Sequence, residues 1–231
     1  FPVYDEGLEN TLKGLLEIQK EHGLDIDWVD ADRIKEVIPG VNENGLRGGT
    51  YSPGDGQVSP LMAADAFWKI AVEHGAEYRF NEKVSSVEIE SGKVTGVRTD
   101  KGAYAAPKVL NAAGGYAREV GEMAGLDVPV TPDSHEAGIS APVKPFLAPL
   151  VVDMRPGPDG RTANFYFGQN HDGRIIFCYT PSELFTGTDR RSQSEFLPVI
   201  ARRLIALIPA FRNLLIRRVW RGLYPITPDG S

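Results

Sequence analysis

The sequence predicts a mixed α/β fold in which two regions alternate along the chain. Three observations predict this class. Val109-Leu110 suit a strand, and a turn of small residues, 111–115, and a helix start follow them. Residues 83–90 and 93–99 alternate with period two around Ser91-Gly92, which is a hairpin pattern. After Val130, prolines and short β-like runs replace the helical periodicity, which favours an antiparallel sheet.

The first 75 residues predict three helices and two short strands. Apolar residues recur at helical spacing from Leu8 to His22, and Gly23 is a stop signal. Trp28-Val29 suggests a strand before a helix at 30–36, and residues 48–51 suggest a second strand. Ser59-Pro60 has the form of an N-cap followed by proline at the first helical position, which predicts a helix from Leu61 to about His74.

The rest of the chain predicts a β-meander and then a second sheet. The meander consists of the hairpin and a third strand at 104–110. Short strands are expected at 137–141, 150–154, 163–168 and 174–179, a helix at 194–207, and a final strand or bend at 216–224.

Composition excludes several classes of protein. The 231 residues are 42% hydrophobic and 24% charged, as in an ordinary globular protein, and the net charge of −6 argues against nucleic acid or an anionic membrane as the main partner. Cys178 has no second cysteine with which to form a disulfide, which fits a reducing cytoplasm. No apolar run approaches the ~20 residues of a membrane helix. Residue 1 is Phe, so we expect a part of a longer protein.

The small-residue turn is the first candidate binding element. Residues 111–115 read Asn-Ala-Ala-Gly-Gly and have almost no side-chain bulk. A tight turn between a strand and a helix lets backbone approach a dinucleotide closely. The alternative is that the small residues serve only packing.

Four ordered segments resemble the D-amino-acid oxidase-like family of FAD-dependent oxidoreductases, which includes sarcosine oxidase, glycine oxidase and the L-proline dehydrogenase β subunits. They are residues 49–60 (GTYSPGDGQVSP), residues 75–97 with Val84, residues 109–114 (VLNAAG) and residues 220–230 (WRGLYPITPDG). The family's opening Gly-x-Gly-x-x-Gly turn has no counterpart here. The resemblance therefore implies an internal fragment of a longer flavoenzyme, which alone binds FAD weakly or not at all.

The resemblance also implies a division into domains and a set of cofactor contacts. Residues 46–130 and 219–231 are expected in an FAD domain, and residues 1–45 and 131–218 in a substrate domain with an antiparallel sheet. The implied cofactor-binding residues are Val84, Asn111, Ala112, Ala113, Gly114, Gly222 and Leu223. Gly222 stands where monomeric sarcosine oxidases carry the flavin-bonded cysteine, so no covalent link is expected there.

Three tyrosines are the candidate catalytic residues. Tyr166 lies where the family places a substrate-contacting tyrosine, and a phenol can donate a hydrogen bond to a carboxylate. Tyr179 lies near a histidine of the sarcosine oxidases, and a core role is the competing interpretation. Tyr224 replaces the carboxylate-binding arginine of glycine and D-amino-acid oxidases, which favours a secondary amine such as proline or sarcosine.

The resemblance implies FAD-dependent oxidation of an amino acid or N-methylated amine by hydride transfer. Two alternatives are a flavoenzyme acting on a 2-hydroxy acid or glycerol phosphate, and a non-catalytic subunit or binding module of the same fold. We expect no metal site and no nucleic acid partner. We also expect a cytoplasmic location and a homo- or hetero-oligomer. The electron acceptor is either oxygen or another carrier, such as one at the membrane surface.

Overall fold

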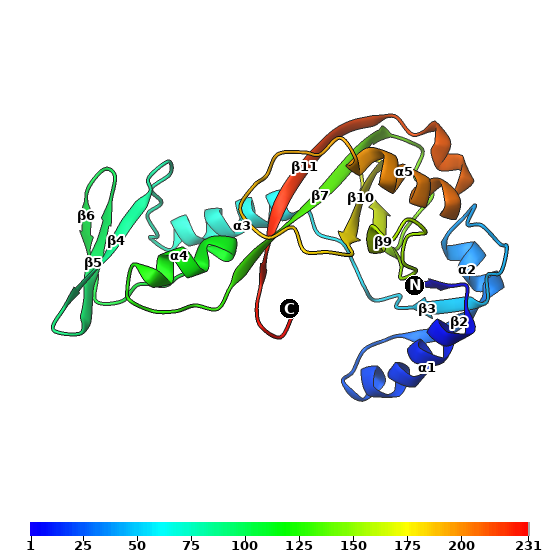
Figure 1. Cartoon of the computed structure of the whole chain (residues 1–231), viewed down its shortest axis with the longest axis horizontal. Coiled ribbons are helices and arrows are strands. Elements are labelled where there is room, and N and C mark those ends of the chain that lie inside the picture. The colour runs from blue at the N-terminus through cyan, green and yellow to red at the C-terminus, as the bar shows by residue number, and fades with distance from the viewer. Residues whose placement is uncertain (231) are drawn as a thin grey trace. The chain divides into compact units, whose positions relative to one another are not determined.

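The computed structural model of the chain describes residues 1–230 and divides them into two compact units (Figure 1). The first unit contains residues 1–57, 135–185 and 190–222. The second contains residues 58–134, 186–189 and the C-terminal residues from Leu223. The sequence places its boundaries earlier, at residues 46, 131 and 219. The assignment of these segments to an FAD domain and a substrate domain stays a proposal.

The first unit begins with two capped helices and a small sheet. The Asp5 carboxylate accepts the Leu8 N–H at 2.8 Å and caps α1, and Asp30 caps α2 in the same way. The strands of the small sheet lie in the order β1-β3-β2. These elements are α1 (Glu6–Glu21), α2 (Ala31–Val37), β1 (Pro2–Val3), β2 (Asp27–Asp30) and β3 (Gly48–Tyr51).

The main sheet of the first unit has the strand order β11-β7-β10-β9-β8. Its β9 and β10 are antiparallel, with Phe167 opposite Phe177 and Phe165 opposite Tyr179. The strands are β7 (Thr131–Pro142), β8 (Val151–Asp153), β9 (Thr162–Gln169), β10 (Arg174–Pro181) and β11 (Ile216–Ile226). The expected antiparallel sheet after Val130 is therefore confirmed, and β7 and β11 each extend beyond the first unit.

One apolar core covers one face of this sheet. Phe177 stacks on Phe196 of α5 (Phe196–Leu207), with ring centroids 6.3 Å apart, and Phe167 meets Phe211 of the 3-10 helix η2 (Pro209–Asn213) edge-on. Ile34 and further residues of α2 join the same cluster. The core holds α2, α5 and the sheet together through burial of aromatic and aliphatic surface.

The second unit contains the meander and two further helices. Ser91 and Gly92 have φ values of 52° and 75°, the left-handed pair that a type I′ hairpin needs, so the hairpin prediction is confirmed. Pro60 begins α3 after its N-cap Ser59, also as predicted. The elements are α3 (Pro60–Glu73), β4 (Val84–Glu90), β5 (Lys93–Thr99), β6 (Ala103–Ala105), the 3-10 helix η1 (Gly114–Tyr116) and α4 (Ala117–Glu122).

One strand prediction is wrong. The third meander strand ends at Ala105, and Val109-Leu110 belong to no strand. Leu110 is 91% exposed. Pro107 has no N–H to give to a ladder, and among residues 1–230 no strand lies beside this segment to pair with it.

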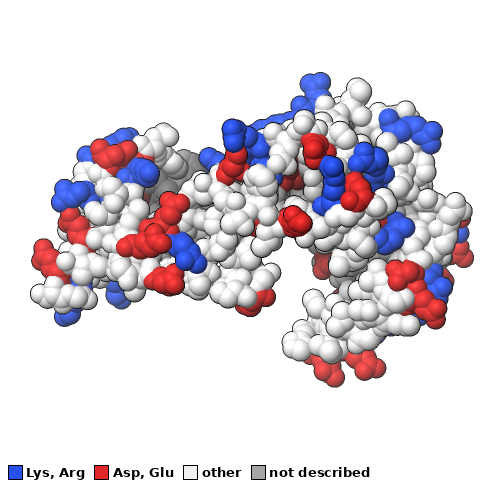
Figure 2. Space-filling view, viewed as in Figure 1, with Lys and Arg blue, Asp and Glu red and all other residues white. Residues whose placement is uncertain are grey.

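The charged side chains do not gather into a field of one sign on the face seen in Figure 2. Acidic and basic residues are interspersed over it, and several form surface ion pairs. This face therefore presents no large field of one sign (Figure 2).

Candidate functional site

Tyr166 lies on the face of the main sheet that points away from the core, called the open face below. Its neighbours on β9, Phe165 and Phe167, are fully buried in the core, so strand alternation turns Tyr166 to the other side. Opposite Tyr166 on β10 is Cys178. Tyr166 is half-buried.

Cys178 is an inert neighbour of Tyr166. Burial raises the pKa of its thiol to about 11, so the thiol stays protonated at neutral pH. A hydrogen bond with Tyr166 and one to the Tyr179 carbonyl, at 3.5 Å, hold the thiol in place. The thiol therefore holds the neighbouring Tyr166 through a hydrogen bond and is not a nucleophile.

Tyr179 lies on the core face, opposite to Tyr166. Its ring stacks on Phe196 with a centroid distance of 5.3 Å, and burial raises its pKa. The structure therefore does not bring Tyr179 together with Tyr166. Its position suits the competing interpretation, a core residue, and the site proposed below does not include it.

A buried ion pair that the sequence did not reveal joins β7 to β11. Arg221 Nε lies 3.8 Å from Glu136 Oε2, and each side chain is 4% exposed. The pair also anchors the segment after β10. Glu136 accepts the Gln193 N–H at 3.1 Å, Arg221 donates to the Arg191 carbonyl at 3.4 Å, and the Arg221 guanidinium stacks 4.1 Å above the Phe185 ring.

The ion pair fixes which way β11 faces. Arg221 points to the core side with Glu136, so Gly222 falls on the opposite side of the strand. Tyr224 follows two residues later on the same side of β11 as Gly222, and it is 45% exposed. Tyr224 belongs to the second unit.

The second unit brings two implied cofactor segments together. A Cβ added to Gly115 would lie 3.1 Å from Leu223 Cβ, so the small-residue turn and the segment from Leu223 are in close contact. Gly114 has a φ of 55°, a conformation that favours glycine. Val84 begins β4 in the meander, opposite Thr99.

The turn fits a bound FAD because its outer surface is mostly backbone. Asn111 folds back onto the turn, donating to the Ala117 carbonyl at 2.8 Å and accepting the Ala113 N–H at 3.2 Å. Ala112, Ala113 and Gly114 add no bulk beyond a methyl group. A phosphate or ribose can therefore approach the main chain here without displacing a side chain.

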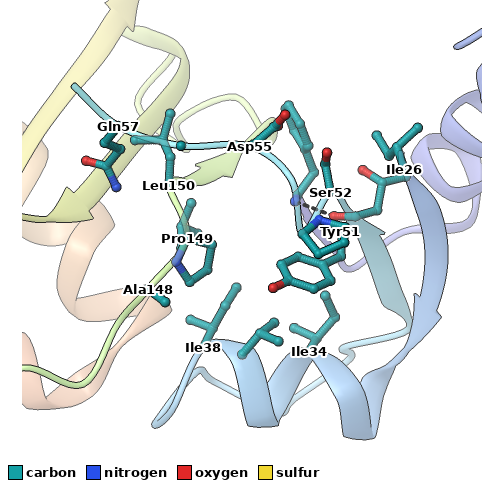
Figure 3. Close-up of a pocket in the computed structure, with 16 residues that line it drawn as sticks. Ile26, Ile34, Ile38, Tyr51, Ser52, Asp55, Gln57, Ala148, Pro149 and Leu150 are labelled. Atoms are coloured by element: carbon teal, nitrogen blue, oxygen red, sulfur yellow. Dashed lines mark hydrogen bonds between the residues drawn. The ribbon is translucent and has the colours of Figure 1, made fainter. Parts of the chain in front are cut away.

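A pocket of about 320 Å³ lies within the first unit, and we call it the Tyr51 pocket (Figure 3). It is lined by Phe1 and Ile26, by α2, by residues 50–53 and 55–57, and by residues 148–151. Residues 53–56 belong to the segment 49–60 that carries the family resemblance, and their part in a pocket arises from contact with segments distant in the sequence.

The described residues contain no group of three or more His, Cys, Asp or Glu side chains placed to hold a metal ion. Among the same residues, no helix is long and apolar enough to cross a membrane.

Comparison with known proteins gives a consistent result. The family model described as "FAD dependent oxidoreductase" matches residues 1–231. The chain is 29% identical over 167 residues to dimethylglycine dehydrogenase, mitochondrial, of Homo sapiens, an alignment covering 70% of this chain and 18% of that protein. It is 26% identical over 219 residues to sarcosine oxidase subunit beta of Arthrobacter sp, which covers 93% of this chain and 52% of that protein.

A solved structure supports the fold. The L-proline dehydrogenase of P. horikoshii superposes with a TM-score of 0.90 and 30% sequence identity, over 99% of this chain and 60% of that chain. The chain thus spans about half of the sarcosine oxidase subunit and less of the dimethylglycine dehydrogenase.

Proposed function

Because the chain belongs to the FAD-dependent oxidoreductase family, we propose that the protein containing it oxidises a small amino acid or an N-methylated or secondary amine. The match of the family along residues 1–231 carries this proposal. Relatives named for sarcosine, dimethylglycine and proline support the substrate class. Glycine oxidase of Geobacillus kaustophilus, with a TM-score of 0.85 and 25% identity, adds a primary amine to the range.

The protein's own task is to hold cofactor and substrate in place. Residues 111–114, with Gly222 and Leu223, would contact FAD. When bound, FAD would accept a hydride equivalent from the substrate carbon next to nitrogen. Val84 would support the cofactor from the meander. Side chains that position the amine are then sufficient, and no strong acid or base is needed.

Two tyrosines are proposed to contact the substrate. Tyr166, on the open face, would turn its single O–H from the Cys178 sulfur to the substrate carboxylate when substrate binds. Tyr224 would present one hydroxyl and an apolar ring to the substrate. An apolar ring suits the methyl group or ring of a secondary amine better than a guanidinium does.

We also infer assembly and location at a coarser level. Relatives named as subunits favour a homo- or hetero-oligomer. A chain with a single, buried cysteine suits a reducing compartment such as the cytoplasm.

The direct test is reduction of enzyme-bound flavin. The native protein containing this chain is purified with FAD and mixed anaerobically with proline, sarcosine, glycine, D-alanine, lactate or glycerol 3-phosphate. Bleaching of the flavin by an amine supports the proposal. Bleaching only by lactate or glycerol 3-phosphate would assign it to hydroxyl substrates, and a protein that binds no flavin would be a non-catalytic member of the family.

A further inference from the structure

One wall of the Tyr51 pocket belongs to the core of the first unit. Ile34 of α2 and Ile38, directly after the end of α2, form one side and are 1% and 3% exposed, so their positions are fixed by packing. Pro149 and Leu150 form the facing side (Figure 3). A rigid apolar wall of this kind favours an aliphatic group over water.

The same pocket has polar groups that make no hydrogen bond to other parts of residues 1–230. Figure 3 shows the Tyr51 hydroxyl directed into the pocket towards Pro149, and Gln57 on the opposite wall beside the sheet. In residues 1–230 no hydrogen bond from another side chain or from the backbone reaches the Tyr51 hydroxyl or the Gln57 amide. Asp55 adds a carboxylate to the lining. These groups can bind a ligand without first giving up an internal hydrogen bond.

Gly168 seats Gln57 against the open face of the main sheet. A Cβ at position 168 would lie 2.6 Å from Gln57 Nε2 and 2.7 Å from Oε1, so any side chain there would displace the amide. The φ of Gly168 is not in the left-handed region, and backbone conformation does not require glycine at this position. The contact with Gln57 is therefore the structural reason for it.

The same contact links the pocket to Tyr166. Gly168 and Tyr166 are two residues apart on β9 and point to the same face, which separates them by roughly 7 Å. Gln57, which lines the pocket, therefore contacts β9 two residues from the open-face tyrosine.

We propose that the Tyr51 pocket holds the aliphatic ring or side chain of the substrate, and that Gln57 hydrogen-bonds to its carboxylate. The inference rests on the proposed function and narrows its substrate class. Amino acids with a ring or branched carbon skeleton, such as proline or pipecolate, are preferred over glycine and sarcosine. Asp55 complements the positive charge of the substrate amine.

A filling substitution tests the pocket. Ala148 is exposed and lines it, so Ala148→Leu reduces the space without disturbing Ile34 or Ile38. Ala210, an exposed alanine of η2 outside the lining, gives the matched control Ala210→Leu. In the native FAD-loaded protein, Ala148→Leu lowers kcat/KM for proline and pipecolate at least tenfold and leaves sarcosine and glycine within twofold. Ala210→Leu changes none of the four. Equal losses for all substrates, or no loss, overturn the proposal.

A double-mutant cycle tests the seat of Gln57. Gln57→Ala and Gly168→Ala each raise KM for proline with little change in kcat. The double variant is no worse than either single variant, because Gln57→Ala deletes the amide that Gly168→Ala displaces. Additive losses would mean that Gly168 acts independently of Gln57, and the linkage would be wrong.

A binding measurement separates this inference from the proposed function. If the native protein oxidises none of the amines, the proposed function fails, and cyclopentanecarboxylate and proline are then titrated into it by calorimetry. Binding to the parent protein that is lost in Ala148→Leu and kept in Ala210→Leu supports the pocket. Absent binding, or equal binding to all three proteins, overturns it.

Discussion

Arg221 on β11 and Glu136 on β7 form an ion pair from which water is almost excluded, with Nε and Oε2 3.8 Å apart. Each partner also holds the segment after β10, through the Arg191 carbonyl and the Gln193 N–H. The pair therefore determines which side chains of β11 point to the core, and it also determines the path of the segment after β10.

Removing one partner of this pair should destabilise the protein strongly. Arg221→Leu leaves the Glu136 carboxylate buried without its counter-charge, and we expect a loss of about 3–5 kcal/mol in the free energy of unfolding. The double variant Glu136→Leu, Arg221→Leu should recover part of that loss, although the Gln193 N–H stays without its acceptor. Urea unfolding followed by circular dichroism measures both. A single variant as stable as the parent would show that the pair contributes little.

Cys178 should make stability depend on alkaline pH. Burial raises the pKa of its thiol from 9.0 to about 11. The unfolded chain loses this proton first, so the folded state is favoured below pH 9 and the contribution disappears as pH rises to about 11. This difference in pKa between the unfolded and folded chain corresponds to roughly 3 kcal/mol. Cys178→Ala should show a shallower fall in stability over this range, because the other titrating groups remain. Parallel curves for the two proteins would contradict the buried thiol as the cause.

Ala113→Asp should abolish FAD retention in the native protein. A carboxylate at this turn would repel phosphates where the main chain must come close. Ala103→Asp, on the exposed strand β6 of the same unit, is the matched control. The measurement is the ratio of FAD to protein after gel filtration. If Ala113→Asp retains FAD as well as Ala103→Asp does, the turn serves only packing.

Tyr224→Arg should shift preference from secondary amines to primary amino acids. Arginine offers a planar fork that matches a carboxylate, whereas tyrosine offers one hydroxyl and a ring that packs on methylene groups worth about 0.8 kcal/mol each. We expect the kcat/KM ratio of proline to glycine to fall about tenfold, or ~1.4 kcal/mol. Proline, sarcosine, glycine and D-alanine are compared in both proteins. Unchanged ratios in a folded variant would remove Tyr224 from the substrate site.

The features that the sequence predicts well are those determined by neighbouring residues. Ser59-Pro60 begins α3 and Ser91-Gly92 forms the hairpin because a cap and a tight turn depend on a few adjacent positions. Val109-Leu110 fails as a strand because a strand also needs a partner, and composition does not say whether one is present.

The features that the sequence missed join distant segments. The seat of Gln57 on Gly168 and the pair between Glu136 and Arg221 depend on which strands become neighbours. The assignment of Tyr166 to the open face follows from alternation on β9 once the core side is known. The cofactor and substrate roles of these residues stay predictions.

The exposed apolar surface of helix α3 should limit the solubility of these 231 residues when they are produced alone. In the part of the chain that the structure describes, α3 buries none of its side chains, and Leu61 and Phe67 are 82% and 74% exposed. When these 231 residues are produced alone, we expect an apolar surface of this extent to bind dyes such as anilinonaphthalene sulfonate and to drive precipitation on heating. Yield and solubility should therefore improve with Leu61→Glu and Phe67→Lys, at little cost to the folding of either unit, before any question of catalysis arises.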